Sequence, residues 1–450
     1  MFSAFLNCWK IPELRRRIVF TLGIVALARL GAAIPCPGVD PTPLNKYISD
    51  IQNQVGGSFV GLAMMLTGGG LQRCAVFALG IMPYITGSII MTLLTAVVPT
   101  LERLRQEGET GRAKLIQYGR YLTVLICVIQ GFFLAKAFEH PDRLFQGFTG
   151  VLVENPGVGF ELLTVITITS GTVLLMWLGE QITQRGIGNG ASMIITVGIV
   201  DRLPSAIAQA WTTLFAGETA VQFRILQAIL LMVMAVVVVA AVVAVTEAQR
   251  KIPVQYAKQI VGRKMRGGQQ VFMPLKVNYA GVMPIIFAQA ILLFPQKIFG
   301  MSHLPIFQKL SRSLTEGEFL YLTLYGLMIL FFSYFWVATQ FNPLQIADDL
   351  KKYGGYVPGI RPGKPTAEYL DHTMTRITLA GAVFLTVIAV IPYLLSHHLR
   401  LPYLTASFFG GTSMLITVGV MLDTMRQVES HLLMRHYDGF LRKGKLRGRR

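Results

Sequence analysis

Apolar runs long enough to cross a lipid bilayer recur along this chain. A membrane helix needs about 20 predominantly apolar residues, and the run 225–246 contains no charged residue. The signal is weakest in 188–208, where Asn189, Asp201 and Arg202 interrupt it. The pattern predicts about ten membrane helices, at 18–35, 74–98, 117–138, 162–179, 188–208, 225–246, 277–299, 319–341, 375–395 and 404–424.

The composition supports the same class of protein. Hydrophobic residues make up 53% of the chain and charged residues 14%, whereas a typical soluble domain has about 25% charged residues. These values exclude an ordinary soluble domain and predict an all-α polytopic membrane protein.

The 41 lysines and arginines are unevenly distributed. They concentrate in the N-terminus, the C-terminal tail and alternate loops, which by the positive-inside rule places both termini in the cytoplasm. Basic residues 15–17 before the first run also resemble a cleavable signal peptide, but its removal would spoil the alternation of the later loops. We expect Arg29, near the outer end of that run, to reach the membrane interface. The basic loops are 99–116, 180–187, 247–276 and 342–376.

Two six-residue phrases in the chain nearly repeat. Gly-Ile-Met-Pro-Tyr-Ile at 80–85 and Gly-Val-Met-Pro-Ile-Ile at 281–286 each open a long apolar segment. Each places a proline, Pro83 or Pro284, where we expect the helix to be weakened or kinked. Internal repeats of this kind indicate a membrane protein of two related halves, with interrupted helices at the working site. A chance match is the alternative.

A short apolar segment precedes the first phrase. It runs from Ser58 to Thr67, too short to span a membrane, and Gly68, Gly69 and Gly70 follow it. A half-helix on a glycine hinge can re-enter the membrane where protein or a water-filled cavity surrounds it. It can equally be an interfacial helix that caps the bundle, and the residues leave both interpretations open.

Two cytoplasmic loops are long and end in turn-rich tips. The loop 247–276 is the most basic, and its mixed polar and β-branched residues predict a protruding hairpin. Four glycines and three prolines in 353–365 are expected to exclude regular structure and to present Arg361 and Lys364 outward. Basic loops can serve only topology and phospholipid contact, but the length of these two favours docking of an acidic partner, RNA included.

The cysteines and histidines indicate no metal site. Cys8, Cys36, Cys74 and Cys127 form no C-x-x-C pair, and a disulfide between Cys36 and Cys74 stays an open alternative. The seven histidines are scattered along the chain. We expect neither a metal nor a cofactor.

Several long motifs resemble those of the SecY family, whose members form the central subunit of the bacterial protein-conducting channel. The likeness covers essentially the whole chain, although the loop tip 265–273 departs from the family pattern. The motifs are Phe-Ala-Leu-Gly-Ile-Met-Pro-Tyr-Ile-Thr-Gly-Ser-Ile-Ile at 77–90, Gly-Ile-Gly-Asn-Gly-Ala-Ser at 186–192, Pro-Leu-Lys-Val-Asn-Tyr-Ala-Gly-Val-Met-Pro at 274–284, Gln-Phe-Asn-Pro at 340–343, Val-Pro-Gly-Ile-Arg-Pro-Gly at 357–363 and Phe-Gly-Gly-Thr-Ser at 409–413.

The resemblance implies an architecture of two inverted five-helix halves around a central hourglass pore. The channel would bind signal sequences, pass unfolded secretory polypeptides across the bacterial plasma (inner) membrane and release transmembrane segments laterally into lipid. Its parts would be an N-terminal half at 1–208 with a plug at 58–72, a C-terminal half at 209–425 with docking loops at 247–276 and 342–374, and a basic cytoplasmic tail at 426–450.

The resemblance also assigns residues to a pore ring, a plug, a lateral gate and a docking surface. Gln289 is our own addition to the gate, from its place near Pro284. The pore ring would comprise Ile81, Ile85, Ile195, Ile286 and Ile416; the plug Phe59, Leu62, Met65, Gly68, Gly69 and Gly70; the lateral gate Thr86, Ser88, Gln130, Gln289 and Phe294; and the docking surface Arg263, Lys264, Arg361 and Lys364. The implied partners are SecE, SecG, the SecA ATPase, the ribosome, signal sequences, nascent polypeptides, YidC, SecDF and anionic phospholipids.

No motif predicts intrinsic catalysis. The nearest approach to a P-loop is Gly363-Lys364, but Pro358 stands where its first glycine belongs. Energy would therefore come from SecA, the ribosome or an ion gradient. A passive protein-conducting channel explains why the spans hold few acidic residues, whereas a proton-coupled carrier would place Asp or Glu in mid-membrane. A structural scaffold would need neither paired proline phrases nor a hinged half-helix.

Overall fold

The computed structural model describes most of the chain, and it divides into two compact units. The first unit comprises Met1–Glu218, Leu401–Thr405 and Ile416–Arg450, and the second comprises Thr219–Arg400 and Ala406–Leu415. Because compactness does not test inverted symmetry, the halves 1–208 and 209–425 stay a prediction. The described residues are 11–45, 47, 68–141, 148, 150–215, 221–256, 259–261, 264–266, 270–300, 305–314, 318–399, 408 and 412–443.

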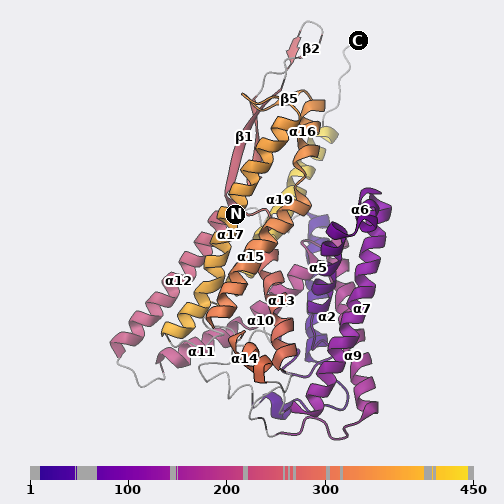
Figure 1. The fold of residues 1–450 in the computed structure, drawn as a ribbon, viewed down its shortest axis with the longest axis vertical. Coiled ribbons are helices and arrows are strands. Elements are labelled where there is room, and N and C mark those ends of the chain that lie inside the picture. Colours follow the sequence, from indigo (N-terminus) through magenta and orange to yellow (C-terminus); the bar gives the residue numbers. More distant parts are fainter. Residues whose placement is uncertain are drawn as a thin grey trace. The chain divides into compact units, whose positions relative to one another are not determined.

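The first unit is helical wherever long elements are described. Its helices α5, α7 and α9 lie side by side, and α2 and α10 pack on α9 (Figure 1). The helices are α2 (Pro12–Ala33), α5 (Met82–Val97), α6 (Pro99–Gln106), α7 (Glu109–Glu139), α9 (Val158–Arg185), α10 (Gly190–Asp201), α11 (Leu203–Phe215) and the greater part of α19 (Thr412–Lys443).

The second unit combines helices with a small antiparallel sheet. The sheet has the strand order β4-β1-β5, and β2 pairs with β3 as a hairpin. The predicted hairpin in the loop 247–276 is therefore confirmed. The elements are α12 (Val221–Glu247), β1 (Gln249–Tyr256), β2 (Gln259–Val261), β3 (Lys264–Arg266), β4 (Gln270–Lys276), α13 (Met283–Gly300), α14 (Pro305–Ser313), α15 (Phe319–Gln340), α16 (Pro343–Lys352), β5 (Gly355–Tyr356) and α17 (Lys364–Leu399).

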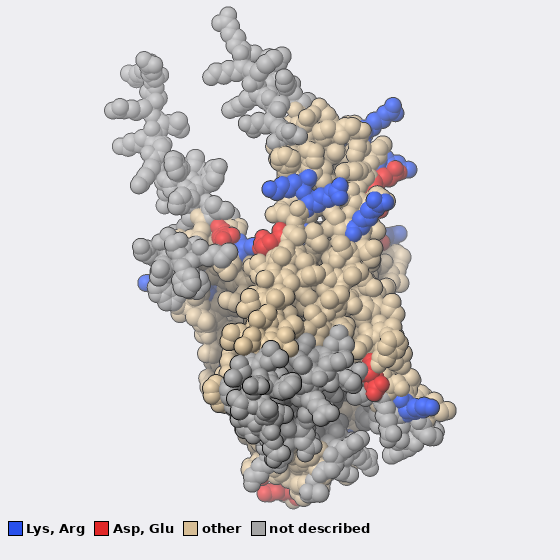
Figure 2. Space-filling model, turned by 90° about the vertical axis from the view of Figure 1, so that its left-hand side faces the viewer, with Lys and Arg blue, Asp and Glu red and all other residues tan. Residues whose placement is uncertain are grey.

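Helices occur at all ten of the predicted membrane spans, but not all of them meet a test of length and hydropathy. Within the described residues, six helices are long and apolar enough to cross a membrane, or seven if α5 and α6, which meet at a 99° bend, form one span. The clearest prediction, 225–246, corresponds to α12. Figure 2 shows a broad uncharged band on one face, with charged side chains mostly beyond it, as expected of a surface in contact with lipid.

Glycines allow the helices of the first unit to approach closely. A Cβ atom on Gly87 of α5 would lie 2.7 Å from the Thr123 Oγ1 atom of α7. A Cβ atom on Gly190 of α10 would collide with the backbone carbonyl of Gly179 in α9. Small residues at such contacts are typical of membrane helices, whose association depends on close packing because lipid is as apolar as the side chains.

Hydrogen bonds connect the turn that precedes α10 to α2 and to α19. Ile187 donates its N–H to Thr21 Oγ1 of α2 at 3.1 Å, and Gly188 donates its N–H to Gln427 Oε1 of α19 at 2.8 Å. The Asn189 side chain then accepts from the N–H of Ser192 and caps α10. The start of α10 is thus fixed by the first and last helices of the unit.

The loop 353–365 differs from the prediction of an entirely irregular segment. Gly355 and Tyr356 form the strand β5, which pairs with Gln255 and Tyr256 at the end of β1. The prediction was wrong there because a two-residue edge strand needs a partner strand rather than a high local propensity. The prolines of the loop lie outside these two residues, where their missing N–H groups cost no sheet hydrogen bond.

The packing of α10 on α9 generates a prediction for Gly190. We expect Gly190→Ala to lower the free energy of unfolding by about 1–3 kcal/mol, because the new methyl group meets backbone that cannot move aside. The thermal unfolding midpoint of the purified protein measures this effect.

Gly23→Ala in α2 is the matched control, since a Cβ atom on Gly23 would meet nothing within 4 Å. It should be neutral or stabilise the protein by up to about 1 kcal/mol. Equal effects of the two substitutions would contradict the close contact.

Candidate functional site

The two repeated phrases have the same backbone conformation. Gly80 has φ 59° and Gly281 has φ 64°, and in each phrase a helix begins two residues later, α5 at Met82 and α13 at Met283. The proline therefore occupies the first turn, where its fixed φ favours helix initiation. The prediction of a kinked or weakened helix was wrong for both phrases, because the glycine turn ends the preceding segment first.

The two phrases also share a backbone hydrogen bond at equivalent positions. The N–H of Ile85 donates to the carbonyl of Ile81 at 3.2 Å, and the N–H of Ile286 donates to the carbonyl of Val282 at 3.4 Å. The glycine, the first-turn proline and the isoleucine two residues after the proline hence occupy matching positions. The two phrases are a structural repeat as well as a sequence repeat.

All five residues of the predicted ring are buried. In the first unit, Ile81, Ile85, Ile195 and Ile416 are 1%, 7%, 2% and 2% exposed. In the second unit, Ile286 is 1% exposed. Each of these side chains is therefore largely shielded from solvent. Their arrangement as one ring stays a prediction.

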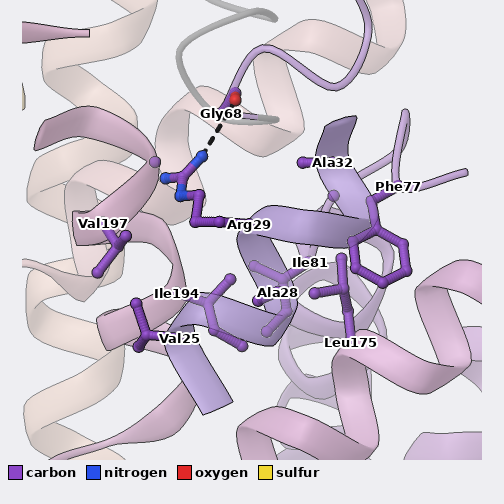
Figure 3. A pocket seen from close by; sticks show the side chains of 12 residues that line it. Val25, Ala28, Arg29, Ala32, Gly68, Phe77, Ile81, Leu175, Ile194 and Val197 are labelled. Carbon is purple, nitrogen blue, oxygen red and sulfur yellow. Dashed lines mark hydrogen bonds between the residues drawn. The ribbon is translucent and has the colours of Figure 1, made fainter. Parts of the chain in front are cut away.

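Ile194 of α10 lies near Ile81, and the place of Ile195 in the ring stays a prediction. The Cδ1 atoms of Ile81 and Ile194 would lie 3.4 and 3.5 Å from a Cβ atom on Gly179. Both side chains also line a cavity of about 30 Å³, together with Val25, Ala28, Phe77, Leu175 and Val197 (Figure 3). Sequence reasoning did not name Ile194, because the resemblance singled out its neighbour Ile195 on α10.

The glycines of the predicted plug form a buried turn. Gly68 and Gly69 have φ values of 60° and 84°, a conformation that favours glycine. The backbone N–H of Ala75 donates to the carbonyl of Gly70 at 2.8 Å and closes the turn. The other predicted plug residues, Phe59, Leu62 and Met65, lie outside the described residues.

Arg29 contacts polar groups of its own unit, and its place relative to the membrane interface stays a prediction. Its Nη1 atom donates to the carbonyl of Gly68 at 3.1 Å (Figure 3) and lies 3.6 Å from Asp201 Oδ2. A carbonyl and a carboxylate of the unit are therefore the partners that the structure gives this guanidinium. The sequence carried one signal of this contact, because Asp201 interrupts the weakest apolar run.

The predicted gate residues have different environments. Thr86 is buried and donates to the carbonyl of Met82 at 3.0 Å, whereas Ser88 is exposed and Gln130 is half-buried. Gln289 is buried in α13. The side chain of Phe294 lies outside the described residues. α5 packs on α7 in the first unit, and α13 packs on α15 in the second.

The predicted docking residues Arg361 and Lys364 lie on a packed part of the second unit. Arg361 and Lys364 are exposed at the beginning of α17, and Thr366 Oγ1 donates to the carbonyl of Arg361 at 2.8 Å. A buried apolar cluster fixes the same region to the sheet; it includes Ile252, Leu275, Val357 and Leu370. Arg263 lies outside the described residues, as does the side chain of Lys264, whose backbone forms the start of β3.

Sequence reasoning missed two ion-pair clusters that join α7 to α9. Arg120 donates to both carboxylate oxygens of Glu180, at 2.9 and 2.6 Å. Near the other end of α7, Lys136 pairs with Glu139 and Glu161. A bidentate pair is geometrically specific, so these contacts fix the register of the two helices. The signal in the sequence was weak because the partners are 60 and 25 residues apart.

The cysteines described by the structure are reduced. Cys36, Cys74 and Cys127 are buried and free, although Cys36 donates its backbone N–H to the carbonyl of Cys74 at 2.8 Å. The alternative of a disulfide between Cys36 and Cys74 is therefore not realised. Among the described residues, no group of three His, Cys, Asp or Glu side chains is placed to hold a metal ion.

These features define a polytopic helical membrane protein with paired glycine-turn helix starts and a buried aliphatic site. Residues 75–425 match the SecY family. The chain is 42% identical to the protein translocase subunit SecY of Thermotoga maritima, with 100% of both chains covered. The chain belongs to the SecY family of protein translocase subunits, as its motifs predict.

Two solved structures share the fold. One is described as a protein-conducting channel; it has a TM-score of 0.60 and 18% identity, over 94% of this chain and 96% of that one. The other has a TM-score of 0.57 and 18% identity over the same shares, and the plug domain of that SecY protein is described as stabilising the closed channel and maintaining a membrane seal. The expected fold class is therefore confirmed.

The environment of Cys36 generates a prediction about its reactivity. Burial raises the pKa of the Cys36 thiol to about 11, so at pH 8 its thiolate fraction should be more than 100-fold below that of free cysteine. In a variant whose only cysteine is Cys36, alkylation by iodoacetamide should be correspondingly slow and should accelerate up to pH 11.

Unfolding the same variant in denaturant is the control and should restore an ordinary profile. The pKa of the Cys36 thiol is about 11 in the folded protein and 9.0 in the unfolded chain. Between pH 9 and pH 11 the thiol is therefore protonated to a greater extent in the native state than in the unfolded state. This contribution to stability is complete below pH 9 and is lost as the pH rises to 11. A native alkylation profile centred near pH 8.5 would contradict the burial.

Proposed function

We propose that this chain forms a protein-conducting channel that passes unfolded secretory polypeptides across the bacterial inner membrane and releases transmembrane segments into lipid. The observation that carries the proposal is the structural repeat: two helices start in the same way after a glycine turn, and each buries an isoleucine at the same position. Membership of the SecY family supports it.

A ring of isoleucines suits such a channel for a physical reason. A narrow aliphatic constriction loses its water readily, so it blocks ions when no polypeptide is present. Its methyl groups make no hydrogen bond to a passing chain, so they do not retain it. Ile81, Ile85, Ile195, Ile286 and Ile416 together provide only aliphatic surface.

We assign the turn at Gly68–Gly70 to the base of a plug formed by 58–72. The buried, left-handed conformations of Gly68 and Gly69 support a defined hinge position. Opening would move the plug away from the ring, and Thr86, Ser88, Gln130, Gln289 and Phe294 would line the seam through which apolar segments leave.

The chain itself supplies no energy under this proposal. SecA or a translating ribosome drives transport after docking on Arg263, Lys264, Arg361 and Lys364. The exposure of Arg361 on a packed support suits such a contact. SecE and SecG complete the complex, YidC and SecDF act with it, and the basic tail and loops face the cytoplasm and its anionic phospholipids.

The ring assignment predicts a leak when the seal is made polar. Replacing Ile85, Ile286 and Ile416 together by asparagine should raise the resting ion conductance of reconstituted channels at least tenfold, because a polar constriction stays wet. It should also relax the selection of signal sequences. Planar-bilayer recording and a secretion assay measure the two effects.

The triple substitution of the same residues by leucine is the matched control, since it preserves an aliphatic collar and should stay sealed. Unchanged conductance in the asparagine variant, at normal levels of assembled channel, would sink the ring assignment.

The docking assignment predicts a defect in transport without a defect in folding. Arg361→Glu should reduce SecA-driven transport into vesicles at least tenfold, since an exposed cation that meets an acidic partner contributes mainly through charge. The thermal unfolding midpoint should be unchanged because Arg361 is exposed.

Lys114→Glu, an exposed charge reversal on α7 outside both docking loops, is the control and should transport normally. Normal SecA-driven transport by the Arg361 variant would argue against its role.

A further inference from the structure

Arg29 contacts two segments that lead to different ring residues. It projects from α2 and donates from Nη1 to the Gly68 carbonyl at 3.1 Å (Figure 3). It also pairs with Asp201 Oδ2 at 3.6 Å. Gly68 begins the run of turns that leads to Ile81 at the start of α5. Asp201 is the last residue of α10, the helix that carries Ile195.

The space for this guanidinium depends on Gly68. A Cβ atom on Gly68 would lie 2.6 Å from Arg29 Nη1 and 3.2 Å from the Cα atom of Gly198. A Cβ atom on Gly198 would lie 3.5 Å from Arg29 Nη2. Any larger residue at position 68 would also be strained, because φ there is 60°. The turn, α10 and the arginine are therefore mutually fitted.

Solvent exposure and neighbouring positive charges weaken the contact between Arg29 and Asp201. The side chains of Arg29 and Asp201 are 25% and 51% exposed, so water can compete for both. Asp201 attracts Arg29 and Arg202, whereas Arg73 repels both arginines. One carboxylate thus attracts two guanidinium groups, and a third guanidinium, that of Arg73, repels both. Such a cluster holds its position more weakly than a closed, neutral ion pair would.

The packing beneath the contact leaves room for movement. A cavity of about 30 Å³ lies between α2, the turn and α10; its lining includes Arg29, Gly68, Ile81 and Val197. That volume admits one or two water molecules. Side chains beside the ring residue Ile81 can therefore shift once the polar contact above them is broken.

We infer that Arg29 is a latch: its contacts with the Gly68 carbonyl and Asp201 hold the segment before α5 against the end of α10 and keep the resting channel closed. The inference rests on the proposed function, because it assumes that Ile81, Ile85 and Ile195 belong to the seal. Arg29 is a positioning residue in this scheme and makes no contact with the transported chain.

The test compares Arg29→Gln with Arg29→Lys in the full channel complex reconstituted in planar bilayers. Arg29→Gln loses the charge that bridges the carbonyl and the carboxylate, and it should raise the frequency of resting openings roughly tenfold, the scale of one hydrogen bond from a charged group. Arg29→Lys keeps a cation that can donate to the Gly68 carbonyl and should stay close to the native frequency.

Arg16→Gln, an exposed arginine of the same helix, is the matched control and should leave the openings unchanged. Ile85→Asn in parallel membranes reports on the ring. If Arg29→Gln leaves the frequency of resting openings unchanged while Ile85→Asn raises it, the latch is overturned and the proposed channel is unaffected. If neither substitution changes the frequency of resting openings, the ring assignment fails together with the latch.

A second variant separates the latch from a role in folding. Asp201→Asn removes the partner charge at a half-exposed position and should raise the openings by a smaller factor at an unchanged unfolding midpoint. Combined with Arg29→Gln it should add little, because both substitutions break one contact. If Arg29→Gln lowers the unfolding midpoint, the result for Asp201→Asn is used instead. A raised frequency of resting openings in Asp201→Asn supports the latch, and a native frequency overturns it.

Discussion

Backbone groups within a membrane must find hydrogen-bond partners inside the protein, and the irregular segments of the first unit satisfy this constraint by pairing with each other. Cys36 donates its N–H to the carbonyl of Cys74 at 2.8 Å, and Val76 donates to the carbonyl of Ile34 at 3.0 Å. A buried apolar cluster encloses this pairing. The turns that precede α5 can therefore be irregular and still occupy a defined position, on which the helix start and its isoleucines depend.

Hydropathy was sufficient to predict the class of protein and the approximate helix positions. The repeated phrases predicted two related segments, although not that each phrase starts a helix. Both patterns were insufficient for the partners of Arg29, because Gly68 and Asp201 are distant from it in the chain. The contact depends on Gly68, whose missing side chain leaves space for the guanidinium once the segments have folded together. The same applies to β5, whose existence depends on its partner strand β1.

Charges in this protein are few within the helices, and their placement is specific. Arg120 with Glu180, and Lys136 with Glu161, join the same two helices near opposite ends. Two distant attachment points restrict sliding and rotation of α7 against α9 more than either would alone. Arg29, by contrast, shares its carboxylate with other arginines. The unit thus combines a fixed helix pair with a more easily rearranged contact around the glycine turn.

The hydrogen bond between Gly188 and Gln427 has a consequence for biogenesis. The residues that it joins are separated by 239 positions, and domains generally begin to fold from the N-terminus during synthesis. α10 is made early, but the turn that starts it gains this partner only after nearly the whole chain has been translated. The first unit therefore cannot complete its folding before the second unit has been synthesised. Its full set of contacts forms only when the ribosome has translated α19.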